Sequence, residues 1–80
     1  MKLVEYNKAF IEGLDIGPEV NLNSLKFNEI EEWDSIGHMS LMSALEETFD
    51  ISLETDDIVD FSSYEKGKEI LKKYNIDIKE

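Results

Sequence analysis

The chain has 80 residues, of which 41% are hydrophobic, and it contains no cysteine. This length fits one small domain, 1–80, with a single core, and the lack of cysteine excludes disulfides, thiolate metal sites and cysteine nucleophiles. Nineteen acidic against eight basic residues give a formal net charge of -11, which disfavours binding to nucleic acids and anionic membranes and favours basic protein surfaces.

Apolar residues at helical spacing predict a first helix from Leu3 to about Leu14. Gly13, Gly17 and Pro18 then interrupt the pattern and predict a long loop before the next helix. Charged and polar side chains interrupt the first fourteen residues, so they contain no signal-peptide core, and no segment is apolar enough to cross a membrane. We therefore expect a cytoplasmic protein.

The clearest periodic segment begins near Ser35 and ends at Asp50. Its apolar residues, spaced by three or four, are Ile36, Met39, Met42, Leu45 and Phe49. Asp34 and Ser35 precede this run, and both residue types are typical helix caps. The segment therefore predicts a second, well-defined helix.

Two further helices follow. Thr55, as a cap before two aspartates, predicts a short helix that reaches Asp60. Ser62 or Ser63 is expected to cap the last helix, whose stripe consists of Tyr64, Gly67, Leu71 and Tyr74. Gly67 inside that helix costs about 1 kcal/mol relative to alanine, which indicates a close helix contact. The sequence predicts an all-α fold: a small four-helix bundle with three main helices, one short helix and a long loop between helices 1 and 2.

Ser35 stands where the first amide groups of the second helix are unpaired and the helix dipole presents positive potential to an anion. A phosphate attached there would be well placed, and Gly37 would let a bulky group or an enzyme approach the backbone. An Asp-Ser pair before an apolar run is, by itself, more often only a helix cap. These residues alone leave both interpretations open.

Taken together, the segments resemble the acyl carrier protein family. The attachment motif of that family, Asp-Ser-Leu at the start of the second helix, is matched by Asp34-Ser35-Ile36. Its following Leu-Glu-Glu-x-Phe stretch is matched, at the same spacing, by Leu45-Glu46-Glu47-Thr48-Phe49. The similarity covers about residues 30 to 74, whereas the first helix is similar only in pattern.

The resemblance implies a monomeric, non-enzymatic carrier whose Ser35 receives 4′-phosphopantetheine from coenzyme A through a separate phosphopantetheinyl transferase. Asp34, Ile36 and Gly37 would flank the attached arm. The arm would supply the missing thiol and carry acyl or related intermediates as thioesters to acyl-loading, synthase or acyltransferase enzymes of fatty acid and lipid metabolism.

An acidic surface suits such a carrier, because long-range attraction speeds its encounter with basic docking patches while exposed ion pairs add little lasting affinity. The candidate docking residues are Glu46, Glu47, Asp56, Asp57 and Asp60. An ordinary solvated surface explains any one of them equally well.

Apolar residues around the second and third helices could line an expandable pocket for an acyl chain. The candidates are Phe27, Met39, Leu41, Met42, Leu45, Leu53, Ile58 and Phe61. Packing in the core accounts for them equally well.

Two positions depart from the family pattern. Gly37 and Ser40 stand where many members carry acidic residues, so the partners are expected to differ from those of a general fatty-acid carrier, which points to a pathway-dedicated acyl or aminoacyl cargo. Carriers for peptide synthesis usually have glycines immediately before the modified serine, whereas Trp33-Asp34 stands here, which favours the acyl type.

A hydrolase is a different interpretation of the same stretch, because Asp34, Ser35 and His38 are the ingredients of an activated nucleophile. Three residues within one turn cannot easily place the imidazole between serine and carboxylate and also form an oxyanion hole. We therefore expect no catalytic residue, and we expect His38 to be a surface residue beside the arm.

The acidic segment from Asp50 to Asp57 invites comparison with an EF-hand. Thr55 and Phe61 occupy the positions where that calcium loop needs glycine and glutamate. We expect no dedicated metal site, while weak binding of divalent cations to clustered carboxylates stays open.

The alternative from another functional class is an acidic helical adaptor that binds basic protein partners without a prosthetic group. Modification of Ser35 separates this adaptor from the carrier.

Overall fold

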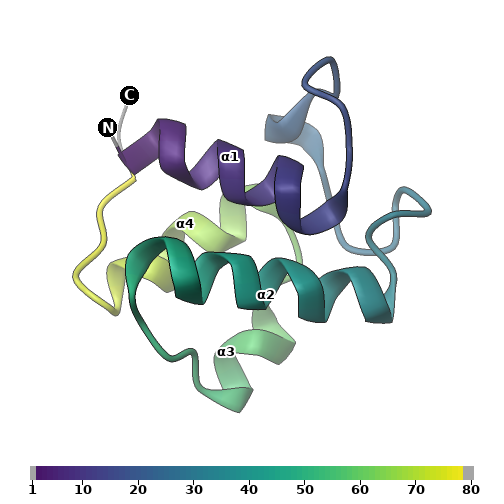
Figure 1. The fold of residues 1–80 in the computed structure, drawn as a ribbon. Coiled ribbons are helices and arrows are strands. Elements are labelled where there is room, and N and C mark those ends of the chain that lie inside the picture. Colours follow the sequence, from purple (N-terminus) through teal and green to yellow (C-terminus); the bar gives the residue numbers. More distant parts are fainter. Residues whose placement is uncertain (1, 79–80) are drawn as a thin grey trace.

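Four α-helices pack around one core in residues 2–78, the residues that this computed structural model describes (Figure 1). The elements are α1 (Lys2–Leu14), the short 3₁₀ helix η1 (Leu22–Ser24), α2 (Ser35–Phe49), α3 (Thr55–Asp60) and α4 (Tyr64–Lys72). These residues form no strand beyond an isolated bridge between Lys26 and Ser63. The predicted all-α fold, with three main helices, one short helix and a long loop after the first, is confirmed.

Local capping sets both ends of α2. The Asp34 carboxylate accepts a hydrogen bond from the Gly37 amide at 2.8 Å, which satisfies one of the unpaired donors at the start of the helix. Asp50 ends the helix with a φ of 53°, in the left-handed region common just after a helix. The bounds of α2 therefore agree with the prediction.

The buried face of α2 packs against α1. Leu41, Met42 and Leu45 are buried, and Gly13 of α1 lies so close to α2 that an added β-carbon would be 2.8 Å from the Leu41 Cα. A glycine is therefore needed where the two backbones approach. The α1–α2 pair therefore forms one side of the core against which other parts of the chain pack.

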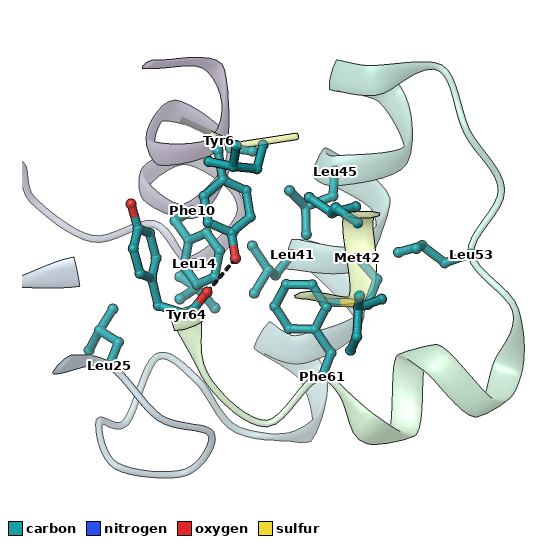
Figure 2. Packing of buried hydrophobic residues seen from close by; sticks show 14 of the residues in the cluster. Tyr6, Phe10, Leu14, Leu25, Leu41, Met42, Leu45, Leu53, Phe61 and Tyr64 are labelled. Atoms are coloured by element: carbon teal, nitrogen blue, oxygen red, sulfur yellow. Dashed lines mark hydrogen bonds between the residues drawn. The ribbon is translucent and has the colours of Figure 1, made fainter. Parts of the chain in front are cut away.

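Aromatic rings from several elements fill the space between α1, α2 and α4 (Figure 2). Tyr6, Phe10, Trp33 and Tyr64 are buried, with the rings of Phe10 and Trp33 edge to face at a centroid distance of 5.5 Å. The Tyr6 hydroxyl donates a hydrogen bond of 2.6 Å to the Tyr64 carbonyl, drawn as a dashed line in Figure 2. The buried phenol therefore has the partner that its position requires.

The predicted close contact at Gly67 is confirmed. A β-carbon there would lie 2.1 Å from the Phe61 Cζ and 2.3 Å from the Tyr6 hydroxyl oxygen. Ser63 caps α4 by accepting a hydrogen bond from the Lys66 amide, so the second of the two predicted caps is the one used.

The predicted Thr55 cap is wrong. Thr55 is the first residue of α3, and Glu54 occupies the capping position without a side-chain hydrogen bond to the helix. Acidic residues in the first turn still complement the positive end of this short helix.

Candidate functional site

Ser35 is the first residue of α2, and its side chain is exposed. Within residues 2–78, no group hydrogen-bonds to its hydroxyl, and the amides of Ser35 and Ile36 have no hydrogen-bond partner there. A nucleophilic oxygen and two unpaired donors therefore face solvent together at the positive end of a 15-residue helix.

Residues on either side of Ser35 differ in what they contribute. The Asp34 carboxylate accepts a hydrogen bond from the Gly37 amide, and this bond holds the helix start in place. Ile36 projects into solvent with 82% of its surface exposed. A β-carbon at Gly37 would lie 1.9 Å from the Glu32 carbonyl oxygen, so glycine is needed here for the preceding loop to pack on α2.

A cleft of about 360 Å³ opens beside Ser35, between α2, α3 and the loop that carries Phe27. Its lining is mostly apolar and consists of Phe27, His38, Met39, Ile58, Val59 and Phe61, together with Ser35 and Ser62. Val59 and Ser62 were not among the predicted pocket residues. Val59 is 74% exposed, since it lies on the outer side of a helix too short to bury two faces.

The eight predicted pocket residues divide into two groups. Phe27, Met39, Ile58 and Phe61 line the cleft. The others, Leu41, Met42, Leu45 and Leu53, are buried in the core and do not line it. Figure 2 shows Leu41 and Leu45 on the side of α2 that faces Tyr6 and Phe10 of α1, and Leu53 on the side of the loop that leads to α3. The cleft therefore meets the core at Phe61, which is completely buried, and does not extend to these four residues.

His38 is not the surface residue that the sequence suggests, because its side chain is half-buried and both ring nitrogens have partners. The Trp33 Nε1–H donates to His38 Nδ1 at 2.9 Å, and His38 Nε2 lies 2.7 Å from the Ile58 carbonyl oxygen. Since an indole nitrogen can only donate, Nδ1 accepts and Nε2 carries the proton that is donated to Ile58. The imidazole therefore joins α2 to α3.

These contacts also bear on the hydrolase alternative. His38 binds Trp33 and Ile58 through its two nitrogens, and Asp34 caps the Gly37 amide, so neither side chain is paired with Ser35. The three side chains do not form the relay that activates a serine nucleophile.

The candidate docking carboxylates lie in three different settings. Glu47, Asp56 and Asp60 are exposed. Glu46 is half-buried, and its Oε2 accepts a hydrogen bond of 2.7 Å from the Leu53 amide. This bond fixes the loop between α2 and α3, so Glu46 has a structural role that the sequence pattern does not indicate.

Asp57 is not on the surface, which corrects its prediction as a docking residue. Its side chain is 5% exposed, and its oxygens lie 2.5 Å from the Lys73 Nζ and 2.5 Å from the Tyr74 hydroxyl. The Lys73 ammonium, and then the Tyr74 hydroxyl, hold the pKa of this carboxyl below its ordinary value. Tyr74 also accepts a hydrogen bond from the Glu54 amide, so the cluster ties α3 to the end of α4.

Across residues 2–78, no three histidine, aspartate or glutamate side chains gather as ligands for a metal ion. None of the helices in that range combines the length and the apolar character needed to cross a membrane. The chain matches no protein-family model, no curated protein and no solved structure.

Proposed function

We propose that this chain is an acyl carrier protein, which holds acyl or related intermediates as thioesters on a 4′-phosphopantetheine group joined to Ser35. The observation that carries the proposal is the Ser35 hydroxyl: exposed, without a hydrogen-bond partner in residues 2–78, at the first position of α2 and in the lining of an apolar cleft. The family resemblance over about residues 30 to 74 supplies the identity of the attached group.

The residues around Ser35 fit a phosphodiester. The unpaired amides of Ser35 and Ile36, together with the dipole of α2, favour a negative charge at this point. The negative charge of the Asp34 carboxylate would repel the phosphodiester. The hydrogen bond from the Gly37 amide partly offsets the negative charge of this carboxylate. Ser35 is exposed and Ile36 beside it projects into solvent, so a modifying enzyme can approach this position.

Modification requires only a nucleophilic oxygen from this chain. The Ser35 oxygen forms a bond to phosphorus as the pyrophosphate bond of coenzyme A breaks, adenosine 3′,5′-bisphosphate leaves, and the hydroxyl proton passes to a base of the transferase. When bound, the group supplies the terminal thiol that this cysteine-free chain lacks. The protein then needs no catalytic residue of its own.

Surface charge supports short-lived encounters with successive enzymes. Glu47, Asp56 and Asp60 are exposed on α2 and α3, and the net charge of -11 attracts basic patches over long range. We propose a cytoplasmic monomer whose partners are a phosphopantetheinyl transferase and acyl-loading, synthase or acyltransferase enzymes. Nucleic acids and membranes are not among the partners of this proposal.

Mass spectrometry tests the proposal directly. The protein is incubated with coenzyme A and a broad-specificity phosphopantetheinyl transferase, and we expect one added 4′-phosphopantetheine that is absent from Ser35→Ala. Ser40→Ala, on the exposed side of the same helix, and Ser62→Ala, in the lining of the cleft, are matched controls and should still be modified. An unmodified wild-type protein would instead favour the acidic adaptor.

A further inference from the structure

His38 lines the cleft beside Ser35 and also packs against two core residues, Trp33 and Phe61. The core residue Phe61 also lines the cleft, whereas Leu41 and Leu45, which are buried as well, do not. The imidazole also supplies a direct hydrogen bond from α2 to α3, through Nε2 and the Ile58 carbonyl. A chain that entered the cleft and continued between these helices would meet this hydrogen bond.

The imidazole is held firmly. Its two nitrogens bind Trp33 and Ile58, and its ring lies 5.2 Å from that of Phe27 and 6.3 Å from that of Phe61, centroid to centroid. Trp33 is completely buried, so moving the imidazole away would leave a buried indole N–H without an acceptor. Displacement is therefore costly for a ligand that offers only apolar contacts.

We infer that His38 is a specificity-determining residue, which confines an apolar chain attached through residue 35 to the surface cleft and keeps it out of the core. For a natural cargo this inference rests on the proposed function, since the cargo would be tethered at Ser35. A cleft of about 360 Å³ is near the lower end for ligand sites, so it favours short or compact apolar cargo over long straight chains.

The absence of cysteine makes a test possible that needs no transferase. Ser35→Cys introduces a single thiol, which is alkylated with N-butyl, N-octyl or N-dodecyl iodoacetamide as the sulfur displaces iodide from carbon. The methyl groups of Met39 and Ile58 then report on the cleft by NMR, and those of Leu41 and Leu45 report on the core. Unalkylated Ser35→Cys provides the reference spectrum.

With His38 in place, we expect all three chains to shift the Met39 and Ile58 methyl signals and to leave those of Leu41 and Leu45 within the spread of repeated measurements. Core signals that move with the octyl or dodecyl chain would overturn the inference. Cleft signals that move with none of the chains would overturn it as well. Because the alkyl chain is attached chemically, either result is independent of whether the transferase modifies Ser35.

Two substitutions then isolate the imidazole. In the Ser35→Cys background, His38→Ala removes the barrier, and we expect the octyl and dodecyl chains to shift the Leu41 and Leu45 signals. His38→Gln keeps a donor for Ile58 and an acceptor for Trp33, and should behave like the parent. Equal core shifts in both variants, or in neither, would contradict the role given to His38. Should His38→Ala fail to fold, the series with His38 in place still decides whether the attached chain stays away from Leu41 and Leu45.

Discussion

Two sides of this small protein are held together by different forces. Between α1, α2 and α4, completely buried rings such as those of Tyr6 and Phe10 pack at a centroid distance of 5.0 Å. On the other side, α3 has six residues and is tied to its neighbours by the hydrogen bond between His38 and Ile58 and by the ion pair between Asp57 and Lys73. Apolar packing thus holds α1, α2 and α4 together, and discrete polar contacts position α3, the helix that borders the Ser35 cleft.

The largest expected effect of a substitution lies on the packed side. Phe10 is completely buried against Tyr6, Trp33 and Tyr64, so Phe10→Ala should lower the free energy of unfolding by about 3–5 kcal/mol. Val59→Ala on α3, where the side chain is 74% exposed, should change it by no more than about 0.5 kcal/mol. Urea unfolding followed by circular dichroism measures both, and similar losses would abolish the contrast between the two sides.

Overpacking at Gly67 should have the next largest effect. The added methyl group of Gly67→Ala would meet Phe61 and Tyr6 at 2.1 and 2.3 Å, and we expect a loss of about 1–3 kcal/mol despite the better helix propensity of alanine. Gly17→Ala is the matched control, since the atoms nearest to its methyl group would be those at the flexible end of the Glu19 side chain. A neutral Gly67→Ala would mean that the two rings can move apart.

These contrasts also show which features a sequence can predict. The start of α2 depends on Asp34, three residues from the amide that it caps, so local pattern is sufficient. Asp57 and His38 depend on partners sixteen and twenty residues away, one of them a backbone carbonyl, and nothing in the local pattern indicates either contact. Ile36 and Met39 follow the apolar periodicity of α2 but are 82% and 54% exposed, so periodicity alone does not show which of these positions the rest of the fold covers.

The ion pair that ties α3 to the end of α4 should make stability depend on pH. The folded-state pKa of Asp57 lies below its ordinary value of 3.8, so its stabilising contribution is present above that value and is lost as the pH falls through the folded-state pKa. Asp57→Asn should therefore be less stable than the wild type at neutral pH, and the difference should shrink in acid. Urea titrations at several pH values measure it.

At alkaline pH the stabilising contribution of the same ion pair is lost as the pH rises. Hydrogen bonding to Asp57 raises the folded-state pKa of Lys73 above its ordinary 10.5, so this contribution is lost as the pH rises through the raised value. Asp56→Asn, at the exposed neighbouring position, is the matched control and should keep the wild-type pH profile. A constant difference between Asp57→Asn and the wild type from acid to alkali would show that the ion pair does not stabilise the fold.

The smallest expected effect on stability comes from Glu47, and it separates docking from folding under the proposed function. Glu47→Lys reverses an exposed charge, so it should change the free energy of unfolding by no more than about 0.5 kcal/mol. It should nevertheless slow modification by the transferase at low salt. This difference in rate from the wild type should fade as added salt screens the charges. Adjacent Glu46 accepts a hydrogen bond from the Leu53 amide, so Glu46→Lys should lower stability as well. Transferase kcat/KM at low and high salt, measured together with urea unfolding, distinguishes Glu47→Lys from Glu46→Lys. A Glu47→Lys protein modified at the wild-type rate at low salt would remove this carboxylate from the docking surface.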